Sequence, residues 1–133
     1  MINQFKIEEI ANHFNVSIEW FIEKREYYGA YNALERTIYL WHNIEDNEIA
    51  QILFHELCHV IDPKSIQKMV GEISEVEELQ SELLAELVAK EFAGNNFFDD
   101  GYIEDLESVL SEKRVKDVIE NVPEYVKVLE EVL

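Results

Sequence analysis

The sequence predicts a single domain of the α+β class, in which a small three-stranded sheet packs on helices. Segments with apolar residues at helical spacing lie at both ends of the chain, and short runs rich in β-branched and aromatic residues lie between residues 16 and 41. Helices and strands are mixed without regular alternation, which favours α+β over α/β. The 133 residues, 47% of them hydrophobic, suffice for one core and leave no room for a second.

All three strands are predicted in the first third of the chain, after one helix. Residues 3–14 have apolar side chains at helical spacing, and Asn15 ends this helix. Residues 16–22 permit two interpretations, a strand or the second helix of a helix-turn-helix. We favour the strand, because a DNA-reading module should be basic and this segment is not. Its β-branched and aromatic residues also alternate. The alternating set is Val16, Ile18, Trp20 and Ile22, with Ser17, Glu19 and Phe21 between them. Residues 26–31 and 36–41 supply the other two strands.

The next helix is predicted to run from about Asp46 to Ile61. Asn43 or Asp46 can cap its start, and Pro63 should end it, because the residue before a proline is pushed out of the helical region. Residues 64–71 have no strong pattern and are expected to form a loop or a short helix.

A capping box predicts where the following helix begins. Ser74 can accept a hydrogen bond from the Glu77 amide, and the Glu77 side chain can reach back. The apolar face of this helix consists of Val76, Leu79, Leu83, Leu87 and Val88. Residues 94–96 should break the helix, and residues 97–101 should form a turn with two aromatic side chains to bury. Helical spacing resumes at Tyr102, and Pro123 should begin a last short helix.

The chain is strongly acidic, with 29 acidic against 11 basic residues and a formal charge of −18. Such a surface repels phosphate backbones, so we expect no direct nucleic-acid binding and favour a basic protein partner. Solubility alone is the competing explanation of the charge. No apolar run is long enough to span a membrane, and residues 1–6 do not resemble a signal peptide. The single cysteine, Cys58, agrees with a reducing compartment, and we expect a cytoplasmic protein.

The most informative motif is His55-Glu56-Leu57-Cys58-His59. Residues four apart share one face of a helix, so His55 and His59 can bind one metal ion while Glu56 beside them transfers protons. This is the HExxH signature of zinc metallopeptidases. The alternative is two surface histidines on an ordinary helix. The mostly apolar residues 49–54 argue against it, because they carry the pattern into a helix that should be buried.

A catalytic zinc ion needs a third protein ligand, and a carboxylate of the following helix is the best candidate. His13 and His42 lie upstream, whereas Glu78, Glu82 and Glu86 form a stripe with one glutamate per turn. We choose Glu82, although spacing alone does not exclude the other two. Glu86 would then hold a ligand imidazole through its other nitrogen and fix its tautomer.

These ligands would leave one position of the zinc ion for water, whose pKa falls to about 7. Glu56 would accept a proton from the attacking water and deliver it to the leaving amine. Tyr28, Tyr31 and Tyr102 are candidates for stabilising the oxyanion, and the sequence does not rank them. Cys58 is expected to be a small buried residue rather than a ligand.

The order of these elements resembles the gluzincin class of zinc peptidases and, more narrowly, the ImmA/IrrE-like family. That order is a leading helix, a strand, a glycine-containing hairpin, a strand, HExxH, and a helix with an E-x-x-A-[D/N]-like motif. The matching segments are residues 7–14, 16–21, 29–31, 37–41, 55–59 and 82–86. Only the HExxH motif is specific for zinc peptidases. The other segments match the family in their order along the chain.

The resemblance covers roughly residues 5–93 and divides the single domain 1–133 into a family-like core, 1–93, and a divergent helical region, 94–133. Cys58 stands where the family usually has glycine and Glu86 where it has aspartate or asparagine. Residues 92–95 lack the usual Leu-Leu-Met-Pro ending.

The resemblance implies a zinc metallopeptidase in which His55, His59 and Glu82 bind Zn2+, Glu56 is the general base and Glu86 supports a ligand. It further implies a protein substrate, typically a helix-turn-helix repressor. The substrate is expected to bind as an added strand along the sheet edge formed by residues 27–33. The alternative is a scaffold without catalytic activity that sequesters a basic DNA-binding protein through its acidic surface.

Overall fold

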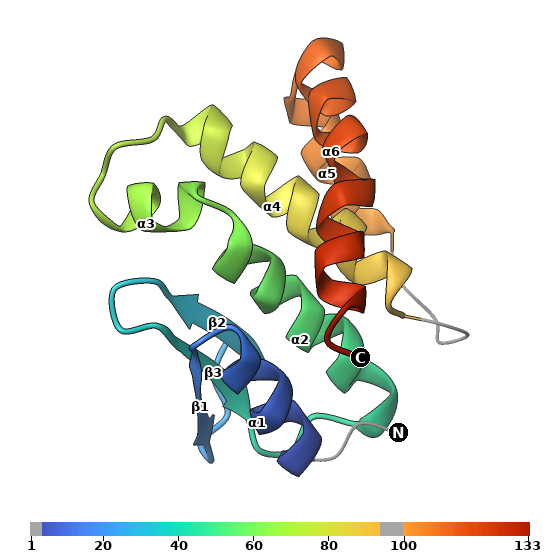
Figure 1. Cartoon of the computed structure of the whole chain (residues 1–133). Coiled ribbons are helices and arrows are strands. Elements are labelled where there is room, and N and C mark those ends of the chain that lie inside the picture. Colours follow the sequence, from blue (N-terminus) through green and yellow to red (C-terminus); the bar gives the residue numbers. More distant parts are fainter. Residues whose placement is uncertain (1–3, 94–99) are drawn as a thin grey trace.

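The protein, described here by a computed structural model over residues 4–93 and 100–133, has an α+β fold, as the sequence predicts. These residues form a three-stranded mixed sheet and six helices (Figure 1). In chain order they are α1 (Gln4–His13), β1 (Ser17–Phe21), β2 (Gly29–Asn32), β3 (Thr37–Trp41), α2 (Asp46–Ile61), α3 (Lys64–Met69), α4 (Glu75–Glu91), α5 (Gly101–Val109) and α6 (Glu112–Glu130). The predicted helix break at residues 94–96 and most of the predicted turn at 97–101 lie outside the described residues.

The sheet has the strand order β1-β3-β2, with β1 parallel and β2 antiparallel to the central β3. Ile38 and Leu40 of β3 are fully buried in the main core cluster. Tyr39 and Trp41 point to the opposite face, because side chains alternate along a strand. Because β3 is the central strand, β2 lies at one edge of the sheet, and it packs beside α2.

Residues 17–21 form a strand, so the helix-turn-helix interpretation of this segment is wrong. The predicted alternation also fails at the end of β1, where Phe21 is buried and Ile22 lies outside the strand, 77% exposed. The cause is the chain beyond β1, which folds back over the Phe21 ring. Tyr27 meets that ring edge-on at 5.7 Å, and the Arg25 guanidinium lies 4.3 Å from its centroid. The strand predicted from residue 26 begins only at Gly29.

α2 occupies the centre of the molecule, between the sheet and α4 (Figure 1). Its bounds are those predicted, but neither Asn43 nor Asp46 caps it. The N-cap is Glu45, and its side chain makes no capping hydrogen bond. Asp46 and Glu48 in the first turn instead face the positive end of the helix dipole, which stabilises the start of α2 electrostatically.

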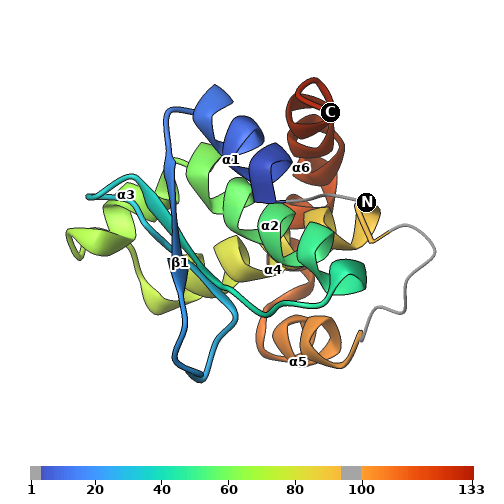
Figure 2. The same cartoon turned by 90° about the horizontal axis from the view of Figure 1, so that it is seen from below.

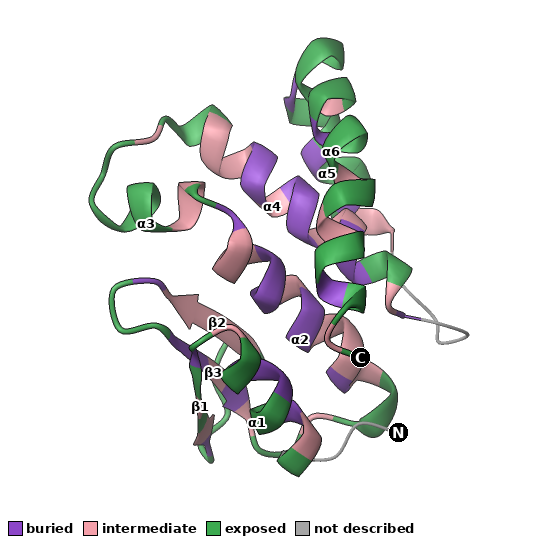
Figure 3. Ribbon diagram, viewed as in Figure 1, coloured by how far each residue is buried: buried purple, intermediate pink, exposed green. Residues whose placement is uncertain are grey.

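α4 begins with the predicted capping box of Ser74 and Glu77. Its buried surface is broader than the predicted stripe, because α4 packs against α2 on one side and against α5 and α6 on the other. Figure 3 shows buried residues along the facing parts of α2 and α4. Val76, expected on the apolar face, is exposed in the first turn, whereas Ser81 and Ala85 are buried.

The C-terminal region contains α5 and α6, which lie at opposite sides of the molecule when it is seen from below (Figure 2). The prediction that Pro123 begins a last helix is wrong, because Pro123 lies inside the continuous α6. Proline removes the bond to the Ile119 carbonyl, but Ile119 is exposed and solvent can satisfy that group. Val118 and Leu129 are buried on either side of the proline and hold both halves on the core.

None of the helices in the described ranges combines the length and the apolar character needed to cross a membrane.

Gly29 allows β2 to approach α2 closely. A Cβ atom at this position would lie 2.8 Å from Ile52 Cγ2, 3.3 Å from Leu40 Cδ2 and 3.5 Å from Glu56 Cγ. Because Ile52 Cγ2 is attached directly to its Cβ, it cannot move away without a change of rotamer or backbone. The missing side chain of Gly29 therefore sets the distance between the sheet edge and the helix that bears the HExxH motif.

Replacing Gly29 by alanine is expected to destabilise the protein by about 1–3 kcal/mol through overpacking. Ile52→Ala removes the nearest methyl group, so the double variant should lose less stability than the two single variants together. Urea denaturation of the four proteins measures this coupling. Purely additive losses would mean that the close approach of β2 to α2 does not depend on this contact.

Candidate metal centre

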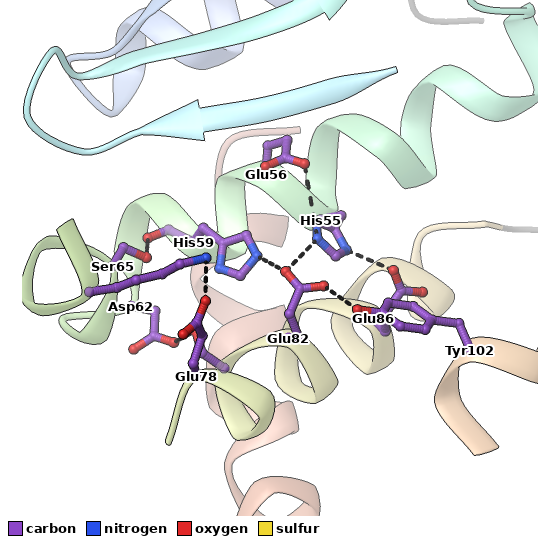
Figure 4. Close-up of polar contacts among 11 residues, drawn as sticks. His55, Glu56, His59, Asp62, Ser65, Glu78, Glu82, Glu86 and Tyr102 are labelled. Carbon is purple, nitrogen blue, oxygen red and sulfur yellow. Dashed lines mark hydrogen bonds and ion pairs between the residues drawn. The ribbon is translucent and has the colours of Figure 1, made fainter. Parts of the chain in front are cut away.

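The facing surfaces of α2 and α4 bring two imidazoles and a carboxylate together (Figure 4). His55 and His59 lie one turn apart on α2, and Glu82 lies opposite them on α4. Glu82 Oε1 is 2.9 Å from His59 Nε2 and 3.5 Å from His55 Nε2. Within residues 4–93 and 100–133, these three form the one group of potential ligands with donor atoms all within 4.8 Å of one another.

The three glutamates of the predicted stripe have different partners. Glu78 forms an ion pair with Lys68 of α3, at 2.9 Å. Glu82 faces the Nε2 atoms of both histidines, and Glu86 Oε1 lies 3.0 Å from the other nitrogen of His55, Nδ1. The structure thus brings Glu82, rather than Glu78 or Glu86, to the point where the two imidazoles converge, a distinction that spacing alone could not make.

The three donor groups could hold a metal ion, and their spacing can be compared with that of a zinc site. Zinc bonds of about 2.0–2.2 Å in tetrahedral geometry place neighbouring ligand atoms about 3.3–3.6 Å apart. The observed separations of 2.9 and 3.5 Å require only small adjustments to reach that range. Two imidazoles with one carboxylate would leave the fourth position of a four-coordinate ion open.

Glu86 orients the first imidazole. Its 3.0 Å contact with Nδ1 leaves Nε2 of His55 directed towards Glu82. A carboxylate on the far nitrogen of a ligand histidine fixes the tautomer and makes the metal-binding nitrogen more basic. At the second histidine, Ser65 Oγ donates a hydrogen bond of 2.5 Å to the backbone carbonyl of His59, which ties the end of α2 to α3.

The cluster concentrates negative potential around the histidines. Burial opposes the charged form of His55, but the contacts with Glu82 and Glu86 outweigh it and raise its pKa well above the usual value. Burial would likewise raise the pKa of Glu82, but the hydrogen bonds from His55 and His59 hold it far below its usual range. The carboxylates around the imidazoles therefore stabilise positive charge at this position.

Glu56 lies on the sheet side of the cluster and is 7% exposed. Its Oε2 atom is 4.0 Å from His55 Nε2. Burial raises the pKa of Glu56, and the two neighbouring imidazoles offset part of that rise. A carboxylate with a raised pKa beside two imidazoles can in principle accept and return a proton.

A cavity of about 350 Å³ opens over these residues. His55, Glu56, His59 and Glu82 all contribute to its wall. The opposite wall is the edge strand β2 with its flanking residues, and α3 contributes its remaining side. The other lining residues are Tyr27, Gly29, Ala30, Tyr31, Ala33, Ser65, Lys68, Met69, Glu78 and Ser81. The cavity is therefore a cleft between a strand edge and the candidate metal ligands.

The three candidate tyrosines are distributed differently around the site. Tyr28 stacks on Trp41, with ring centroids 5.0 Å apart, and lines a different cavity. Tyr31 lines the cleft. The Tyr102 hydroxyl donates a 3.1 Å hydrogen bond to Glu82 Oε2, and burial together with the Glu82 charge raises the pKa of Tyr102 to about 12. Cys58 is fully buried, as expected, and is not among the clustered donors.

The sequence did not identify one buried interaction beside the site. Ser81 donates a 2.7 Å hydrogen bond to Asp62 Oδ2, and the Lys64 amide donates to Oδ1 at 3.1 Å. This bond links the end of α2 to the turn of α4 that carries Glu82. Asp62 precedes a proline, so its sequence context indicates only a helix end, and no spacing rule connects it to Ser81.

Comparison with family models, with curated proteins and with solved structures found no match to this chain. The resemblance to zinc peptidases therefore rests on the residues and on the site they form.

Glu82→Gln is expected to weaken zinc binding by more than about 100-fold, because removing a ligand should exceed the 10–100-fold cost of removing a supporting residue. Glu78→Gln lies one turn away on the same helix and should leave the affinity unchanged. Competition with a chromophoric chelator measures both dissociation constants. Equal affinities for the two variants would exclude Glu82 as the third ligand.

Proposed function

We propose that this protein is a zinc-dependent metallopeptidase that hydrolyses a peptide bond in a protein substrate. His55, His59 and Glu82 would hold the zinc ion, and Glu56 would be the general base. The observation that supports this most is that Glu56 and all three donor residues line one cleft, whose other wall is the edge strand β2. A structural metal site would require neither an open cleft nor a buried carboxylate beside the ligands.

The reaction divides between the bound ion and the protein. A zinc ion in this site supplies a Lewis acid, which makes water nucleophilic near neutral pH and polarises a carbonyl group. Glu56 accepts the proton of the attacking water and returns it to the leaving amine. Its burial keeps it in a dry environment, and its 4.0 Å distance from His55 Nε2 keeps it beside the ligands without making it one of them.

The edge of β2 offers backbone groups to an extended substrate. Tyr28 O accepts a hydrogen bond from Trp41 N, which makes Tyr28 and Trp41 a hydrogen-bonded pair across the two strands. In the antiparallel register of β2 and β3, such pairs alternate with pairs whose N–H and C=O groups point outwards. Gly29 and Tyr31 occupy the outward positions and line the cleft. A peptide added as a strand can hydrogen-bond to both residues.

The resemblance to the ImmA/IrrE-like family supports a helix-turn-helix repressor or a similar regulator as the substrate. The net charge of −18 agrees with a basic, partly unfolded segment of such a protein. The single cysteine agrees with a reaction in the cytoplasm.

The acidic surface also supports a second candidate, a scaffold without catalytic activity that sequesters a basic DNA-binding protein. The two functions differ in their need for Glu56. Sequestration through surface charge would leave wild type and a Glu56 variant equally effective against the partner, whereas proteolysis would not.

Glu56→Gln preserves the size of the side chain but removes its basicity, so peptide hydrolysis should slow by at least about 100-fold. The measurement is mass spectrometry of new N-termini in a proteome-derived peptide library incubated with zinc-loaded protein. Chelator competition on the same preparations should give equal zinc affinities for the variant and wild type.

Cleavage products present with wild type and missing with Glu56→Gln support the peptidase. Products formed equally by both proteins, or by neither, would contradict it.

A further inference from the structure

Tyr102 contacts the metal centre from outside the two helices that supply the candidate ligands. It belongs to α5, and its hydroxyl donates a 3.1 Å hydrogen bond to Glu82 Oε2 (Figure 4). The other oxygen of the same carboxylate, Oε1, faces His59 Nε2 at 2.9 Å and His55 Nε2 at 3.5 Å. The two oxygens of Glu82 therefore have separate partners.

Packing restrains Glu82 less than the other two candidate ligands. Its side chain is 27% exposed, whereas both imidazoles are 15% exposed. Glu86 also fixes His55 through Nδ1. A glutamate has three rotatable bonds, and ordering such a side chain has a cost in conformational entropy. If a hydrogen bond already holds one oxygen of Glu82, less side-chain conformational entropy is lost when the other oxygen binds a metal ion.

α5 can hold the tyrosine in a fixed position, because the helix is anchored by residues next to Tyr102. Ile103 and Leu106 are 4% and 3% exposed and belong to the main core cluster, and α5 packs directly on α4. Tyr102 itself is 47% exposed, so its hydroxyl contact adds little to the core. The contact is therefore suited to orienting Glu82 and contributes little to the stability of the fold.

We propose that Tyr102 is a positioning residue, which holds Glu82 with one oxygen directed at the two imidazoles and makes α5 part of the metal centre. This inference rests on the metal site of the proposed function but not on peptidase activity. It assigns a role at the site to the region 94–133, which lies outside the segments that resemble the peptidase family.

Tyr102→Phe removes only the hydroxyl and should weaken zinc binding by about 10–100-fold, the usual cost of losing a hydrogen bond to a metal ligand. Chelator competition measures the affinity, and urea denaturation of the metal-free protein should give the wild-type midpoint. Tyr125→Phe is the matched control, because Tyr125 is a partly buried tyrosine of α6 that lines a separate cavity. Its zinc affinity should equal that of wild type.

A double variant tests whether Tyr102 acts through Glu82. In the Glu82→Ala background, Tyr102→Phe should cause no further loss of zinc affinity. The visible absorption of the Co2+-loaded protein, which depends on coordination geometry, should change in Tyr102→Phe and not in Tyr125→Phe.

An unchanged affinity in Tyr102→Phe, an equal loss in both backgrounds, or a loss explained by a lower stability of the metal-free protein would each overturn the proposal. These outcomes can be distinguished from those that would contradict the proposed peptidase function. Normal zinc binding without Glu56-dependent cleavage would contradict the peptidase and leave the role of Tyr102 intact. Failure of wild type to bind zinc would overturn both.

Discussion

The packing of α2 on α4 is the constraint on which the rest of the site depends. Neither helix contains the candidate metal centre alone, because the two histidines lie on one and the carboxylate on the other. The residues next to the ligands are apolar and fully buried, including Leu57, Leu83 and Ala85, so the core that joins the helices also sets the distance between Glu82 and the imidazoles. A shift of one helical turn would move α4 by about 5.4 Å and bring Glu78 or Glu86 to the histidines instead.

The site has a cost in stability that a bound cation can offset. Glu56, Glu82 and Glu86 place three carboxyl groups around two imidazoles, and Glu56 is buried. Burying carboxylates close together is unfavourable unless positive charge compensates them. Without a metal ion, His55, whose pKa is raised well above its usual value, can provide that charge. Because a cation would bind the folded arrangement and not the extended chain, its binding free energy would add to the free energy of unfolding.

Features that depend on local spacing were predictable from the sequence, whereas features that depend on tertiary contacts were only partly so. The bounds of α2, the capping box of α4 and the pairing of His55 with His59 follow from short-range rules, and all three agree with the structure. Glu82 was the glutamate chosen from the sequence, and it does face the histidines, but excluding Glu78 and Glu86 needed the relative position of two helices. The continuation of α6 through Pro123 needed knowledge of which face is exposed. Tyr102 lies 20 residues beyond Glu82, and nothing in its local pattern distinguishes it from a packing tyrosine.

The acidity of the chain acts on two length scales, and this separation bears on how a substrate would be selected. Over the whole surface, a charge of −18 would attract a basic partner, but such an attraction decays over a Debye length of about 8 Å at physiological ionic strength. Inside the cleft, Glu82 faces the histidines and Glu78 is neutralised by Lys68. Glu56 and Glu86 add two further carboxyl groups beside the histidines, and Tyr27, Tyr31 and Met69 add apolar surface to the cleft. In the proposed reaction, long-range charge therefore governs encounter with the substrate, whereas the backbone edge of β2 and these apolar side chains govern which segment binds.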